Sequence, residues 1–225
     1  MRATRRSLAE PLLLIVVIAA ASALWVLHAR AWDLGGRSPV LSYDPAQYAI
    51  AARQLATTGR LTTTFALPIE LARHPAPPWP LAVVQPGLVL IEAALFRLAP
   101  AHFTLGRRIE ASFARPDQIE WLVLMLPLLC TMATAGVLGV AALRLFRRDA
   151  TDGPAWTRFA GALSVSLVFL LDPESQHFAV GGFTEPPFTL GLAVALAMLA
   201  FGTAARRPFA FGLVLGVTGL FRGNM

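Results

Sequence analysis

The sequence predicts an all-α polytopic membrane protein, and three observations support this fold class. Of the 225 residues, 56% are hydrophobic and only 14% are charged, which exceeds the ~45–50% apolar fraction of ordinary soluble domains. Uncharged runs of 17, 23 and 20 residues begin at Pro11, Trp121 and Pro186, and a spanning helix needs roughly 20 such residues. All 19 basic residues are arginine, and most of them flank apolar runs, as membrane-anchoring charges do.

The composition also excludes several classes of protein. The net charge of +6 is not arranged as a basic stripe interleaved with aromatic residues, so nucleic acid is not an expected partner. The single cysteine, Cys130, lies inside an apolar run, which excludes an intrachain disulfide and a cysteine-based zinc cluster. The sequence has no glycine-rich phosphate loop, no HExxH motif and no recognisable Ser/His/Asp triad.

The first apolar run has two interpretations. Residues 1–31 have a basic start, MRATRRS, and a passable cleavage pattern, ARA, at residues 29–31, as a secretory signal peptide would. The apolar run is longer than the ~7–15 residues of a signal core. We therefore interpret it as an uncleaved anchor.

Arginine clusters at residues 2–6, 144–148 and 206–207 predict the orientation, because basic flanks stay on the cytoplasmic side. The N-terminus is then cytoplasmic. About five transmembrane helices alternate in direction, over residues 11–29, 121–143, 158–171, 186–205 and from 208 onward.

Two of these spans are short. The third has 13 uncharged residues, 159–171, which at ~1.5 Å per residue fall short of a ~30 Å hydrocarbon core. Either Arg158 snorkels to the interface, or Asp172 lies below the membrane surface in a protein-lined cavity. The fifth has about 14 residues before Arg222, so we expect a truncated span and a chain that is the N-terminal part of a longer protein.

Residues 31–120 form a long outer loop in this topology, and we expect amphipathic interfacial helices in it. Residues 45–58 predict one helix, because Tyr48, Ala51 and Leu55 recur at helical spacing and Gly59 is a natural stop. Residues 81–99 are apolar enough to resemble a span. A crossing there would place the second arginine cluster outside, and Pro86 interrupts the run, so we expect a helix at the interface.

Two acids begin helices on the outer side. Asp44 precedes Pro45 and lies three residues before Gln47, a pattern typical of an N-cap with a capping-box glutamine. Glu185 follows Thr184 at the start of the fourth span, where Thr184 would cap and the acid would complement the helix dipole. Both acids are also candidates for a functional cavity, because a carboxylate at the membrane edge can accept a proton or help to hold a divalent cation.

Three further polar residues have two interpretations each. His74 and His177 lie on the outer side by this topology, either as solvated loop residues or as ligands that join the carboxylates around a metal. Arg222 lies ~21 Å along the last helix from Pro208. At that depth an arginine needs an anion, either an acid on another span or a phosphate.

Four motifs in order resemble the N-terminal half of integral-membrane glycosyltransferases of the GT-C class, closest to the aminoarabinose-transferase and protein O-mannosyltransferase-like families. They are DPAQYAIAARQLATTG, HPAPPWPLAVVQPGLVLIEAALFRL, GGFTEPPF and FGLVLGVTGLFRG. Pro45 stands where many members of these families have a second acid.

The resemblance implies a single transmembrane domain over residues 1–225, in a bacterial inner (plasma) membrane. Its expected activity is inverting transfer of a sugar from a polyprenyl-phosphate donor to an acceptor hydroxyl on the outer face. The resemblance implies Asp44 and Glu185 as catalytic residues and Tyr48, His74 and Arg222 as substrate-binding residues. No metal ligand is assigned, and the cofactor stays open with a divalent metal as one candidate. The expected partners are the lipid-linked donor and membrane lipid.

A non-catalytic alternative remains open at this point. In a polytopic protein for transport, scaffolding or envelope assembly, Asp44 and Glu185 would serve only as helix-start residues. Asparagine caps a helix about as well as aspartate but cannot act as a base, so substitution at Asp44 distinguishes the two classes.

Overall fold

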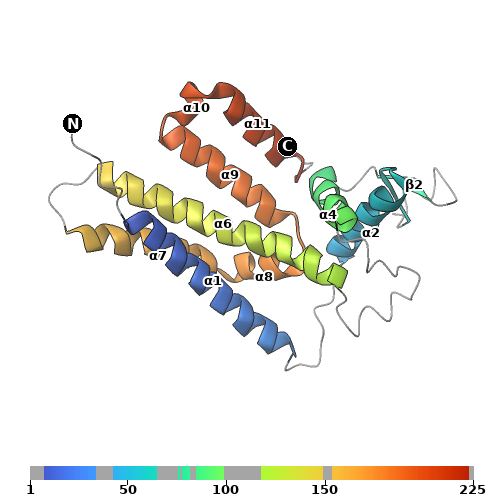
Figure 1. The fold of residues 1–225 in the computed structure, drawn as a ribbon, viewed down its shortest axis with the longest axis horizontal. Helices are drawn as coiled ribbons and strands as arrows, with labels where there is room; N and C mark the ends of the chain where they lie inside the picture. The colour runs from blue at the N-terminus through green and yellow to red at the C-terminus, as the bar shows by residue number, and fades with distance from the viewer. Residues whose placement is uncertain are drawn as a thin grey trace.

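A computed structural model describes residues 8–33, 43–64, 76, 78–81, 85–98, 118–148 and 154–222. Most of these residues are helical, which confirms the all-α prediction apart from one minimal strand pair (Figure 1). The helices are α1 (Ala9–Asp33), α2 (Tyr43–Thr58), α4 (Pro86–Leu98), α6 (Gln118–Arg148), α7 (Ala155–Leu171), α8 (Pro173–Gly181), α9 (Glu185–Ala200), α10 (Thr203–Arg206) and α11 (Pro208–Gly219). Strands β1 (Thr62–Thr63) and β2 (Trp79–Pro80) pair antiparallel.

The main core lies between α1, α6 and α7. Leu13, Val17 and Ala21 recur every four residues, so they form one buried stripe on α1. They pack into a cluster with buried residues of α6 and α7. Ser166 on α7 donates a hydrogen bond to the Ala135 carbonyl on α6, at 2.8 Å, so the two helices lie very close at this level.

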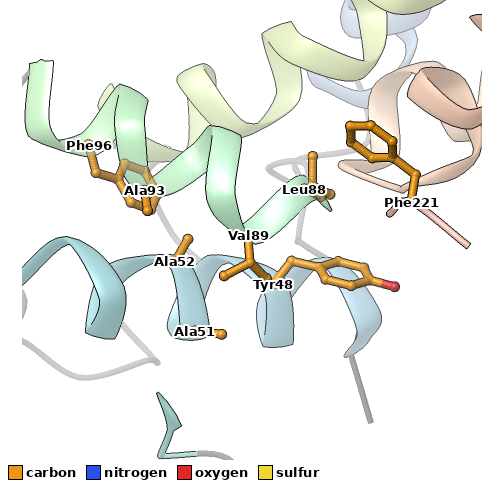
Figure 2. Packing of buried hydrophobic residues seen from close by; sticks show 8 residues of the cluster. All are labelled: Tyr48, Ala51, Ala52, Leu88, Val89, Ala93, Phe96 and Phe221. Atoms are coloured by element: carbon orange, nitrogen blue, oxygen red, sulfur yellow. The ribbon is translucent and has the colours of Figure 1, made fainter. Parts of the chain in front are cut away.

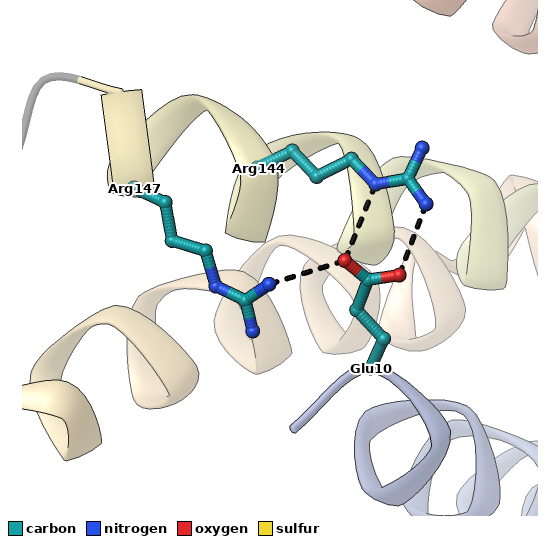
Figure 3. Close-up of polar contacts among 3 residues, drawn as sticks. All are labelled: Glu10, Arg144 and Arg147. Carbon is teal, nitrogen blue, oxygen red and sulfur yellow. Dashed lines mark hydrogen bonds and ion pairs between the residues drawn. The ribbon is translucent and has the colours of Figure 1, made fainter. Parts of the chain in front are cut away.

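Contacts between helix ends define the direction of each helix. Glu10 at the start of α1 pairs with Arg144 and Arg147 at the end of α6, at 2.9 and 3.1 Å, so α1 and α6 run antiparallel (Figure 3). Arg148 donates to the Ala200 carbonyl at 3.2 Å, so α6 and α9 end at the same level and run parallel. We call the level of these contacts the arginine end of the bundle.

Two of the helices are long and apolar enough to cross a membrane: α1 over Ala9–Leu27 and α6 over Met125–Arg148. The pair α7 and α8 together would make a third span, bent by 62° between the two helices. Helices α9 and α11 are apolar but shorter. These helices indicate a membrane protein, whereas the number of five spans remains a prediction.

The third predicted span agrees in its end with α7, which stops at Leu171, and the fourth differs from the helix observed there. After the third, the Asp172 carboxylate accepts a 2.7 Å hydrogen bond from the Ser175 amide and caps α8. The fourth was expected to continue to residue 205. Helix α9 instead ends at Ala200, where Gly202 adopts a φ of +66°, and the short helix α10 follows.

Helix α2 agrees with the predicted spacing but begins earlier. It starts at Tyr43, so Asp44 lies within its first turn and not at the N-cap. It ends at Gly59, where φ is +71°, as the sequence predicts. The Arg97 guanidinium of α4 donates to the carbonyls of Leu55 and Ala56, at 3.1 and 3.3 Å. The Leu55 carbonyl also accepts the Gly59 amide at 3.0 Å, so Arg97 adds to the hydrogen bonds that satisfy the last turn of α2.

Candidate functional site

The candidate site is built around a second apolar cluster, formed where α2 and α4 pack side by side at the end of the bundle opposite the arginine end (Figures 1 and 2). Small side chains allow this close packing: Ala51 and Ala52 are fully buried on α2, and Ala93 lies across from them on α4. The cluster consists of Tyr48, Ala51, Ala52, Leu88, Val89, Ala93, Phe96 and Phe221.

The end of α11 joins this cluster through a backbone contact. The Gly87 amide, in the first turn of α4, donates to the Leu220 carbonyl at 2.9 Å. Amides in the first turn of a helix and carbonyls past the last turn lack partners within their own helix, so the two ends satisfy each other. A Cβ at residue 87 would lie 2.8 Å from the Leu220 oxygen, so this approach requires glycine. Phe221 is consequently buried in the cluster.

Helix α9 reaches the same cluster through its first turn. Phe188, three residues into α9, packs against the cluster. The Arg222 guanidinium lies over the Phe188 ring, 5.3 Å from its centroid, a cation–π contact worth ~0.5–1 kcal/mol at an exposed site. Arg222 is exposed and has no ion pair among the described residues. The first of the two anion partners expected for Arg222, an acid on another span, is therefore not observed among the described residues.

Glu185 opens α9 in that same turn. It is half-buried, and its Oε2 atom is buried with no hydrogen-bond partner among the described residues. Thr184 occupies the cap position but makes no side-chain cap hydrogen bond, so the capping role predicted for it is wrong. Glu185 therefore presents a buried carboxylate oxygen whose hydrogen-bonding capacity is unused among the described residues.

Tyr48 forms part of the wall between α2 and α4. Its hydroxyl donates to Gln85 Oε1 at 2.9 Å, just before α4 begins. The ring points along α2 toward the end of the cluster where Phe221 lies (Figure 2). The structure thus places Tyr48 in the cluster and Arg222 over the Phe188 ring that packs against it, while Glu185 lies in the same turn of α9 as Phe188.

The other two predicted site residues are described only in part or not at all. Asp44 lies in the first turn of α2, one helical turn before Tyr48, and its side chain lies outside the described residues. His74 lies wholly outside the described residues. Their roles remain predictions.

Glu92 is a candidate that the sequence analysis missed. It is fully buried, and neither carboxylate oxygen has a hydrogen-bond partner among the described residues. Burial raises the pKa of the Glu92 carboxyl well above its usual range, since low-dielectric surroundings disfavour the charged form. The spacing of the sequence could have indicated that Glu92 is buried, because Leu88, Glu92 and Phe96 follow each other at four-residue intervals on the buried face of α4.

The part of the chain that the structure describes contains no set of ligands for a metal ion. No group of three or more His, Cys, Asp or Glu residues there is arranged to hold a metal ion. His177 instead lies against two aromatic rings, with centroids 5.6 Å away for Phe178 and 5.3 Å for Phe183.

Comparison with known proteins yields no family for this chain, which matches no family model, no curated protein and no solved structure.

Proposed function

We propose that the protein is a membrane glycosyltransferase that moves a sugar from a polyprenyl-phosphate carrier to an acceptor hydroxyl, with inversion, on the outer face of the membrane. One observation supports this proposal above the others. Asp44 lies in the first turn of α2, one turn before Tyr48, and Tyr48 is part of the apolar cluster. The first turn of α9, which contains Glu185, and the end of α11, which contains Arg222, meet at the same cluster. Asp44, Glu185 and Arg222, which we propose as base, second acid and phosphate-binding cation, therefore belong to segments that meet at this cluster.

The chemistry assigned to these residues is a single displacement. The Asp44 carboxylate removes the proton of the acceptor hydroxyl, and the hydroxyl oxygen forms a bond to the anomeric carbon of the sugar. The bond from that carbon to the phosphate oxygen breaks on the opposite face, and the phosphate leaves with the electron pair. The Arg222 guanidinium stabilises the charge that develops on the phosphate. Glu185 supplies the second acid of the proposed site.

The sidedness of the proposal rests on the arginine end of the bundle. Basic residues are retained on the cytoplasmic side, so the opposite end, with the cluster, faces outward. There it meets a donor presented in the outer leaflet.

Substitution at Asp44 tests this function. Asp44→Asn should lower sugar transfer from a labelled polyprenyl-phosphate donor in liposomes by ~10²–10⁴, the usual contribution of a general base. Asp44 lies in the first turn of α2, where losing its charge costs ~0.3–1 kcal/mol of helix-dipole stabilisation, so the melting temperature should fall only slightly. Glu185→Gln should also lower transfer.

Glu174→Gln is the matched control, because Glu174 is an exposed acid in the first turn of α8. It should leave transfer unchanged. Full transfer by Asp44→Asn would show that Asp44 only starts a helix, and the non-catalytic alternative would then be the better account.

A further inference from the structure

A second feature, remote from the site above, is an apolar groove between α1, α6 and α9. It has a volume of about 750 Å³. Leu14 and Ile18 of α1 line one side, and Val194 and Met198 of α9 line the other. Small residues of α6, with Ala133 exposed among them, form its floor. Two of the three helices that bound it are those long and apolar enough to cross a membrane.

The length of the groove suits one hydrocarbon chain. Along α6 it extends from Leu129 to Arg144, which is ~22 Å at the helical rise of ~1.5 Å per residue. Half of a ~30 Å hydrocarbon core is ~15 Å. A lipid chain of one leaflet therefore fits along the floor, with several ångströms left at the arginine end for the head group.

The mouth of the groove at the arginine end is positively charged. Arg144 and Phe201 both line it, and the Arg148 guanidinium lies 4.9 Å from the Phe201 ring centroid. Glu10 is the one acid among the described residues at this end, and Arg144 and Arg147 share it (Figure 3). Two arginines on one carboxylate leave one positive charge unbalanced.

Further charges surround this mouth. Arg206 and Arg207 lie exposed just beyond the groove residue Thr203, and no hydrogen bond or ion pair is described for either guanidinium. The described residues at this end therefore carry an excess of positive charge.

We propose that this groove binds an anionic phospholipid, with one acyl chain along α6 and the phosphate among the arginines of the mouth. Basic pockets between membrane helices are suited to anionic lipid head groups, and an unbalanced positive charge beside an apolar channel is complementary to such a lipid. A second copy of the chain fits less well. A two-fold contact through this groove would bring two copies of the same basic surface together, and like charges in an interface are costly.

The test is lipid retention by the whole chain, measured by native mass spectrometry after purification from liposomes of equal phosphatidylglycerol and phosphatidylcholine. We expect phosphatidylglycerol to be retained preferentially. Ala133→Phe fills the floor of the groove and should abolish retention. Ala160→Phe is the matched control, because Ala160 is exposed on α7 and does not line the groove, so its retention should equal that of the wild type.

The charge requirement is tested separately from the groove. Arg206→Gln combined with Arg207→Gln should weaken phosphatidylglycerol retention about fivefold per arginine, which is the effect of ~1 kcal/mol per basic residue near an anionic surface. Arg60→Gln is the control, because Arg60 is exposed near the opposite end, just after α2. It should change nothing.

Three results would overturn the proposal. Unchanged retention by Ala133→Phe would mean that the lipid binds elsewhere. Equal retention of the two lipids by the wild type would remove the anionic requirement. A lipid-free dimer that Ala133→Phe converts to a monomer would show that a second copy occupies the groove.

Discussion

At the scale of single residues, Glu92 stands out because an ionisable carboxyl group lies in apolar surroundings. A buried carboxylate without a partner is costly, and such a group usually stays protonated instead. Glu92 is fully buried on the face of α4 that packs into the cluster. Burial thus raises the pKa of this carboxyl and favours its neutral form, and its ionisation would oppose the packing of α4.

We predict that Glu92 makes stability fall as pH rises. The folded pKa lies well above the ordinary value of 4.5, so between these two pKa values the folded state holds a proton that the unfolded state has released. Stability then declines by about 1.4 kcal/mol per pH unit, beginning near the unfolded pKa and ending at the folded pKa. Glu92→Gln should remove this decline, because an amide releases no proton. Melting temperatures in detergent at a series of pH values measure it.

The exposed acid Glu174 again supplies the control for this prediction. Glu174→Gln should retain the decline of the wild type, because that side chain lies outside the apolar cluster. If the melting profiles of wild type and Glu92→Gln run parallel over the whole pH series, then the carboxyl is not held neutral by burial.

At the scale of elements, the cluster depends on the contact between the start of α4 and the end of α11. The Gly87 amide bonds to the Leu220 carbonyl, next to the buried Phe221, while the packing of α11 against α9 holds Arg222 over the Phe188 ring. Residues more than 130 positions apart in the chain thus form one site. The integrity of the site therefore depends on a glycine that itself carries no chemistry.

We predict that Gly87→Ala destabilises the protein and separates α11 from α4. The new Cβ would lie 2.8 Å from a backbone oxygen, which cannot rotate away as a side chain can, and overpacking of this kind costs typically ~1–3 kcal/mol. Gly216→Ala is the matched control in α11, because nothing lies within 4 Å of its Cβ position. Alanine there should stabilise by ~0.4–1 kcal/mol. Melting temperatures of the two variants should move in opposite directions, and equal shifts would contradict this account.

The sequence predicted some elements well because their signals are local. The spacing of Tyr48, Ala51 and Ala52 and the stop at Gly59 define α2. Apolar runs locate α1 and α6 in the same way. The apolar pattern was wrong about the end of the fourth span, because α9 stops at Ala200 and a separate short helix follows it.

For the candidate site, the sequence predicts which residues are candidates but not how they contact one another. Topology places Glu185 and Arg222 on the same side of the bundle, and that much follows from arginine positions. The cation–π contact of Arg222 and the burial of Glu92 depend on tertiary packing, which one sequence does not reveal.

At the scale of the whole molecule, the two ends of the bundle differ in chemistry. The arginine end carries Arg144, Arg147, Arg148 and Arg206, with Glu10 as the one described acid. The opposite end carries the apolar cluster, the Glu185-bearing turn and Arg222. Both proposals, glycosyl transfer and lipid binding, require these ends to lie on opposite faces of a membrane.

We predict that Arg60 is outside the cell and Arg206 is inside. Each is exposed and can be replaced singly by cysteine in a Cys130→Ala background, because Cys130 is the only native thiol. A membrane-impermeant maleimide added to intact cells should label Arg60→Cys and miss Arg206→Cys, and both should react after the membrane is permeabilised with detergent. Reversed labelling would place the arginine end outside, contrary to the retention of basic flanks in the cytoplasm. It would leave the candidate site without access to an outer-leaflet donor. Labelling of both positions in intact cells would mean that residues 60 and 206 lie on the same side of the membrane. The three alternating crossings predicted between them, by α6, α7 and α9, would then be wrong.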